Sequence, residues 1–197
     1  MSHTRKPTEK EIGDARDILH DLLFFATETV RLRNQYAPRF IDRYAKRPDA
    51  LDFSVDQFHE SIDDFKETDW KAFGLGNEMY ATVGHLSTVV ETCHSKLDGR
   101  RFEFPSTEIQ ALKDADQTLR MKTPAETTTE EQPQITETKP SEIDIQRVAD
   151  FIEENELRTS LRKAILQKMQ DKGAGMRKQT FCQVMNILED RGTWTDG

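Results

Sequence analysis

The sequence predicts an all-α protein in which an antiparallel helical bundle is followed by a flexible linker and a small three-helix C-terminal module. Apolar residues recur at spacings of three and four along most of the chain, and no segment alternates long enough to suggest a sheet. Residues 122–140 are rich in Thr, Glu, Gln and Pro, with Ile135 as the one sizeable apolar side chain. Such a segment buries too little apolar surface to offset the entropy lost on ordering. We therefore predict a bundle over 1–121, a linker over 122–140 and a module over 141–197.

Composition excludes several classes of protein. The apolar fraction is 35% and the mean hydropathy is -0.77, which fits thin amphipathic helical layers better than one large core. A net charge of -8 argues against the whole chain acting as a polycation on nucleic acid. No run approaches ~18 apolar residues and the N-terminal residues lack a signal-peptide pattern. We expect a cytoplasmic protein that does not enter a membrane.

The first helix of the bundle has a clear predicted start. Thr8 and Glu11 have the spacing of a capping box, and Pro38 should end the helix near Tyr36. Its apolar stripe is broad enough to face two or more partner helices. The members of that stripe are Ile12, Ala15, Leu19, Leu22, Ala26 and Val30.

The second part of the bundle is predicted to begin with a short helix through residues 40–44 and a loop over 49–53. Ser54 and Gln57 then have capping-box spacing, which predicts the start of the next helix. Acidic residues crowd the end of this helix, so we expect it to stop near Thr68 or Asp69.

The most regular stripe in the chain has alternating gaps of four and three. It predicts a helix that is firm from about Asn77, after the weakening glycines Gly74 and Gly76. Two interpretations stay open: the core of this bundle, which we favour, or the seam of a homo-oligomer. The stripe comprises Ala72, Gly76, Met79, Val83, Leu86, Val90, Cys93 and Leu97.

The remaining helices follow from similar signals. Residues 100–105 should lie extended over the bundle, and Thr107 should open the last bundle helix. In the module, Ser141 is predicted to cap the first helix, with a turn near Asn155. Gly173 should close the second helix and Gly192 the third.

Histidine and carboxylate pairs at a separation of three are the main candidates for metal or acid–base chemistry. They are Asp17 with His20, Asp56 with His59, and Glu91 with His94. Helical phase puts them at the flank of the apolar stripes or further out, without additional inward carboxylates. We therefore predict no metal, no cofactor and no enzyme activity, with Cys93 and Cys182 as buried free thiols.

A basic region near the C-terminus is the main candidate for a partner-binding face. It contains Arg158, Arg162, Lys163, Lys168, Lys172, Arg177 and Lys178, against Asp171 alone. The segment reads as helix, glycine-containing turn and helix, an order that helix-turn-helix proteins share. Trp194 has two interpretations, a ring folded over the module core or an exposed binding anchor.

These features predict a non-enzymatic interaction protein, an adaptor or an accessory subunit of a larger assembly. Its bundle and its basic module would each bind protein, an acidic surface being the expected target of residues 158–178. The alternative is a nucleic-acid-associated regulator that uses the module as contact surface and the bundle for oligomerisation.

Overall fold

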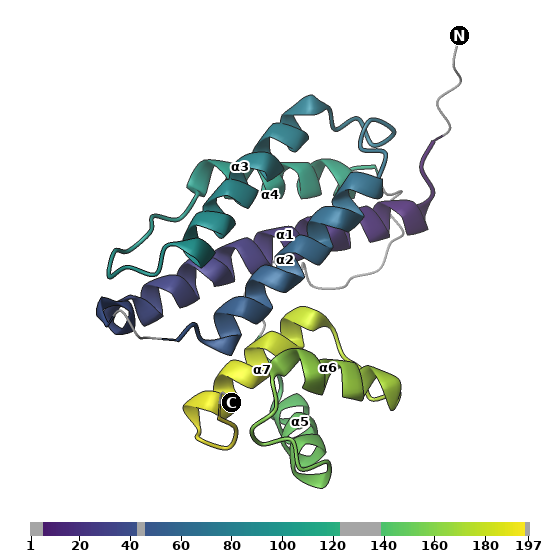
Figure 1. The fold of residues 1–197 in the computed structure, drawn as a ribbon. Helices are drawn as coiled ribbons and strands as arrows, with labels where there is room; N and C mark the ends of the chain where they lie inside the picture. Colours follow the sequence, from purple (N-terminus) through teal and green to yellow (C-terminus); the bar gives the residue numbers. More distant parts are fainter. Residues whose placement is uncertain (1–5, 43–45, 123–138, 196–197) are drawn as a thin grey trace. The chain divides into compact units, whose positions relative to one another are not determined.

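The structure is a computed structural model that describes residues 6–42, 46–122 and 139–195. The predicted linker lies almost entirely outside these residues. Contacts divide the chain into two compact units, which we call the bundle (1–46 and 54–126) and the module (47–53 and 127–197). Every regular element in the described residues is helical (Figure 1), which confirms the all-α prediction.

In the bundle, α1 (Glu9–Tyr36) begins as predicted. The hydroxyl of Thr8 accepts from the Glu11 backbone at 3.2 Å, and the Thr8 backbone donates to the Glu11 carboxylate at 2.7 Å. After α1 the chain forms a 3-10 helix, η1 (Ala37–Ile41). The sequence predicts a separate helix over 40–44, of which residues 43 and 44 lie outside the described residues. Pro38 has no N–H to donate, so the α-helix cannot continue through it.

The predicted start of the next helix was wrong. Helix α2 spans Asp49–Glu67, so residues 49–53 are helical and do not form a loop. Ser54 lies inside this helix and so cannot cap it, and its buried hydroxyl lies 2.9 Å from that of Thr29. Pro48 followed by Asp49 and Asp52 is itself a start signal, because acidic residues in a first turn complement the helix dipole.

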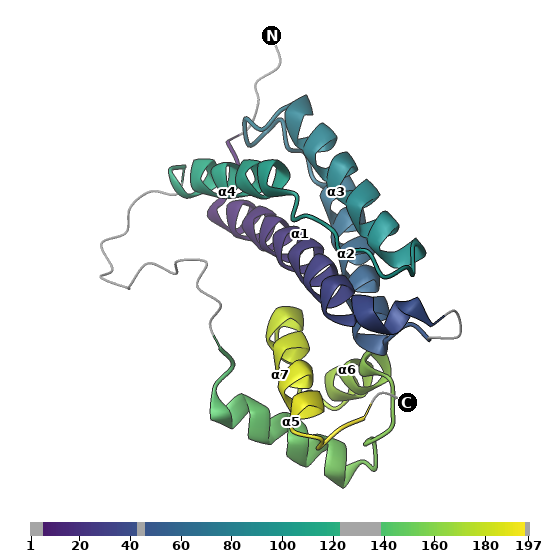
Figure 2. The ribbon, with the colours of Figure 1, turned by 90° about the vertical axis from the view of Figure 1, so that its left-hand side faces the viewer.

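Helices α3 (Asn77–Ser95) and α4 (Ser106–Arg120) both pack along α1, and they also contact each other (Figures 1 and 2). The regular stripe of α3 is buried inside the chain, as the core interpretation requires, and not left open as a seam. Its buried members are Met79, Val83, Leu86, Val90 and Cys93. Helix α4 starts at Ser106, directly after Pro105, and Thr107 is not its cap.

Hydrogen bonds hold the connection between α3 and α4 against the end of α1. The side-chain amide of Asn34 donates to the Phe102 carbonyl at 2.9 Å and accepts from the Phe102 N–H at 2.7 Å. Next to it, the buried Arg33 guanidinium donates to the Lys96 carbonyl at 2.7 Å and lies 5.2 Å from the Phe102 ring. Two consecutive residues of α1 thus satisfy backbone groups that this irregular segment would otherwise leave unpaired.

The module contains α5 (Glu142–Glu154), α6 (Arg162–Asp171) and α7 (Lys178–Asp190), together with the first residues of α2. The predicted Ser141 cap is present, since its hydroxyl accepts from the Asp144 N–H at 3.1 Å. Gly173 and Gly192 follow α6 and α7 with φ of 67° and 68°, a conformation that glycine adopts at little cost. The core is built from Ile145, Val148, Ile152, Ile165, Met169, Phe181, Val184, Met185 and Leu188.

Each helix in the described part of the chain is too short or too polar to cross a bilayer.

Candidate interaction sites

Carboxylates line a shallow groove of about 390 Å³, largely open to solvent, between residues of α1 and the end of α2 on the bundle. The α1 residues stand three and four apart, which places them on one helix face. The α2 residues are in the last turn, where the negative end of the helix dipole adds to their charge. The groove is lined by Asp14, Asp17, Ile18, Asp21, Asp64, Glu67 and Thr68. We call it the acidic groove.

The acidic groove favours a positively charged ligand, because clefts lined by one sign of charge concentrate counter-charges. Four of its carboxylates are exposed, those of Asp14, Asp17, Asp64 and Glu67. Over the described residues, no three His, Cys, Asp or Glu side chains are arranged to hold a metal ion. Carboxylates dispersed along a groove suit several separated cationic side chains better than one compact ion. Sequence reasoning noted the acidic end of α2 but not the matching acidic face of α1.

A second cluster surrounds the buried carboxylate of Asp116 on α4. Arg16 and Arg120 each donate from Nε at 2.8 Å, and His20 Nε2 lies 3.1 Å from Oδ1. Burial alone would raise the pKa of Asp116, but the Arg16 hydrogen bond and the charges of His20 and Arg16 outweigh it and lower the pKa. The Asp116 carboxylate of α4 thus joins this helix to Arg16 and His20 of α1.

Two of the histidines considered for metal or acid–base chemistry contact carboxylates of neighbouring helices. His20 turns to Asp116 of α4, and His59 on α2 lies 2.7 Å from Glu91 on α3. His85 on α3 lies 3.5 Å from Glu108 on α4. Each of these histidines therefore meets a carboxylate from a neighbouring helix, which sequence spacing could not reveal.

The predicted basic face is not continuous. Arg158, Lys163, Lys172 and Arg177 are exposed, and Lys168 and Lys178 are half-buried. On α6, Lys163 and Lys168 point about 140° apart. Arg158 pairs with Glu153 at 3.0 Å, and Lys172 donates to the Asn155 side chain. As contacts to a partner, these six residues remain a prediction.

The prediction of Arg162 as a partner-binding residue and of Trp194 as a possible exposed anchor was wrong, because both are buried in the module. Arg162 donates to Asn186 Oδ1 at 2.6 Å and to Glu189 Oε2 at 2.7 Å. The Trp194 ring lies 5.1 Å from the Arg162 guanidinium, and its indole N–H donates to the Ser160 carbonyl at 3.0 Å. Of the two interpretations of Trp194, the structure shows the ring folded over the module core. Arg162 is part of that core and not of a basic face.

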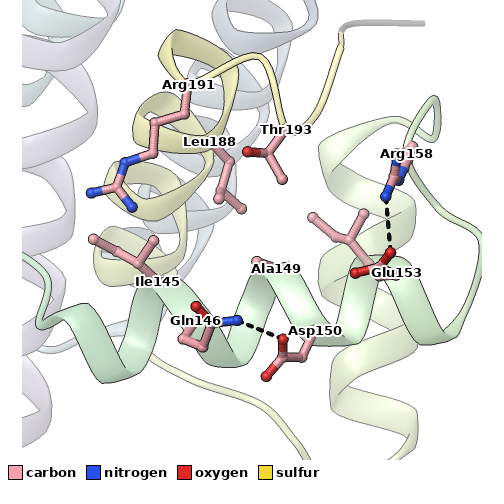
Figure 3. Close-up of a pocket in the computed structure, with 10 residues that line it drawn as sticks. Ile145, Gln146, Ala149, Asp150, Glu153, Arg158, Leu188, Arg191 and Thr193 are labelled. Carbon is pink, nitrogen blue, oxygen red and sulfur yellow. Dashed lines mark hydrogen bonds and ion pairs between the residues drawn. The ribbon is translucent and has the colours of Figure 1, made fainter.

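A cleft of about 220 Å³ lies between α5 and the end of α7. Figure 3 shows Arg191 and Arg158 at its two ends, with Leu188 and Ala149 between them. Both arginines pair with exposed glutamates at 3.0 Å, contacts that contribute little. None of the described residues that line the cleft has a buried polar atom without a partner. The cleft therefore indicates no particular ligand chemistry.

No family model, curated protein or solved structure matches this chain.

Proposed function

We propose that this protein is a non-enzymatic interaction adaptor, or an accessory subunit of a larger assembly, that holds a basic segment of a protein partner in the acidic groove. The observation that supports this most is the convergence of five carboxylates from two helices on one groove. Lysine and arginine side chains of a partner would replace the solvent in the groove, and their affinity would fall steeply as the salt concentration rises.

The module would be the second binding site of the same adaptor. Bundle and module each have a buried apolar core, and the chain joins them both through residues 123–138 and through α2, whose first residues belong to the module. When two sites share one chain, the second binding event becomes intramolecular, and affinity rises by about 10²–10⁴-fold without new contacts. Modest affinity at each site is then enough.

We propose that the partner is a protein and not a nucleic acid. Lys178, Gln179 and Gln183 on α7 are half-buried, whereas a helix that reads a DNA groove needs an exposed face. Cys93 and Cys182 are buried and form no disulfide, which fits a reducing compartment, and we propose that the protein is cytoplasmic.

The groove can be tested with fluorescent octalysine as a probe of basic character. A triple variant, Asp14→Asn, Asp17→Asn and Asp64→Asn, should bind it about tenfold more weakly than the wild type, since each exposed pair contributes about 0.5 kcal/mol. The matched control removes three exposed carboxylates elsewhere on the bundle: Glu78→Gln, Glu103→Gln and Asp114→Asn.

The control has the same net charge as the groove variant, so any difference between them reports position and not total charge. We expect the control to keep wild-type affinity within about twofold, the scatter of surface substitutions. Equal loss in both variants, or no loss in either, would contradict a binding role for the acidic groove.

A further inference from the structure

Residues 47–53 belong to the module by their contacts, although more than eighty residues separate them from α5 in the sequence. They form the beginning of α2, and their apolar side chains are buried: Pro48, Ala50, Leu51 and Phe53. Within the module, these residues therefore occupy a position that a separate helical peptide could fill.

Asp49 supplies the N-terminal cap that α6 lacks in its own sequence. The residue at the N-cap position is Leu161, which has no side-chain acceptor. Asp49 Oδ2 instead accepts from the Arg162 backbone N–H at 3.0 Å. A carboxylate at this position satisfies a free N–H and complements the positive end of the helix dipole.

Phe53 makes the second contact, since its ring lies 5.8 Å from that of Phe181 on α7. Asp49 and Phe53 are four residues apart in a helix, so both side chains project from one face. The module thus contacts an acidic group and an aromatic ring that stand one helical turn apart.

The chain's own segment does not use all the donors of this site. Arg162 is fully buried, and its Nε has no hydrogen-bond partner. Asp49 Oδ2, which accepts from the Arg162 backbone, is 3.8 Å from this Nε. An unpaired buried N–H costs free energy, so a carboxylate that reached both the backbone N–H and Nε of Arg162 would fit better than Asp49.

We infer that the module is a recognition site for a partner helix with an acidic residue and a phenylalanine four residues later, and that residues 49–53 fill this site as an internal ligand. A partner helix of this pattern competes with the internal segment and replaces it. This inference rests on the proposed function, because it names the chemistry by which the module would take its partner.

The test uses the full-length chain and a fluorescent peptide with the sequence of residues 46–60. In the wild type the internal segment, present at a high effective concentration, should exclude the peptide. The variant Asp49→Ala with Phe53→Ala, which we call the open variant, lacks the two contacts that anchor the internal segment. The peptide should therefore displace this segment and bind at least tenfold more tightly than it binds the wild type. The control Asp56→Ala removes an exposed acid of α2 outside residues 47–53, and it should behave like the wild type.

A second peptide with alanine at the positions of Asp49 and Phe53 should not bind the open variant. Equal binding of both peptides, or equal affinity of variant and wild type for the first, would overturn the inference. If the double variant does not fold by circular dichroism, Asp49→Asn replaces it. Amide exchange in the first turn of α6 should then quicken about fivefold, as for a lost cap, and unchanged exchange would also overturn the inference.

These outcomes are separate from those of the groove experiment. Peptide binding without octalysine binding would support the module site and contradict a binding role for the acidic groove. Octalysine binding without peptide binding would support the acidic groove and contradict the module site.

Discussion

The guanidinium of Arg162 and the carboxylate of Glu189 form a charge-assisted hydrogen bond of 2.7 Å that joins α6 to the last turn of α7. The arginine is fully buried, whereas the glutamate remains in part exposed. Asn186 accepts a second hydrogen bond from the same guanidinium at 2.6 Å, and Trp194 covers it. One buried cation therefore organises the C-terminal end of the module.

Arg162→Ala should lower the free energy of unfolding of the module by about 2 kcal/mol or more, because two charge-assisted hydrogen bonds and the packing under Trp194 are lost. Arg162→Lys should recover part of this, since an ammonium group cannot reproduce the planar fork. Amide exchange of residues 142–190 under urea measures both. Lys163→Ala, at the next and exposed position, is the matched control and should change stability by less than about 0.5 kcal/mol; an equal effect would contradict the role of Arg162.

Asp116→Asn should destabilise the bundle at pH 7 by about 2–3 kcal/mol, because Arg16 and Arg120 lose a buried charged partner. The folded-state pKa of Asp116 is lowered, so its contribution is complete above the unfolded value of about 3.9 and is lost as pH falls through the folded pKa. The stability difference between wild type and variant should therefore shrink below about pH 4. Thermal unfolding from pH 7 to 3 tests this, with Asp114→Asn as the exposed control; a difference that stays constant with pH would count against it.

Cys93 should be inert in the folded protein. Burial raises the pKa of its thiol to about 11, and the nearby Arg33 offsets this only in part. The folded state thus favours the protonated thiol, so this contribution is complete below the unfolded pKa of about 8.5 and is lost as pH rises toward 11. Cys93→Ala should be less sensitive than the wild type to pH between 9 and 11, measured by urea unfolding. Equal sensitivity would contradict the assignment.

Asn34→Ala should release the segment between α3 and α4, because the Phe102 N–H and carbonyl both lose their partner. We expect a loss of about 1–2 kcal/mol and faster exchange of the Phe102 amide. Asn34→Asp keeps an acceptor for the N–H but sets a carboxylate against the carbonyl, so its exchange should be intermediate. Gln35→Ala changes the neighbouring exposed residue and should leave Phe102 unaffected.

Local signals in the sequence predicted much of the fold. Thr8 with Glu11, and Ser141 with Asp144, are caps whose partners are three residues away, and the sequence displays such pairs directly. Ser54 also has capping-box spacing, with Gln57, and this local signal led to a wrong helix start. Its hydroxyl contacts Thr29 on α1, a partner that the spacing does not reveal.

The candidate sites could not be predicted in the same way, because their partners are distant in the chain. Arg162 appeared to be one more basic surface residue, whereas its buried position depends on Glu189 and Trp194. The acidic groove needs the register between α1 and the end of α2, which periodicity does not determine. The cap that Asp49 gives to α6 joins positions 113 residues apart.

The most direct test of the account is whether the two units act as joined binding sites. A protease site is placed within residues 123–138 of the variant Asp49→Ala with Phe53→Ala, which lacks the contacts by which residues 49–53 hold the module after cleavage. This chain is cut after folding, and a partner captured from the native cell is then titrated against its cut and intact forms. We predict that cutting weakens binding of the partner by about 100-fold while each half keeps its helical circular dichroism. Equal affinity of the cut and intact protein would contradict two-site binding.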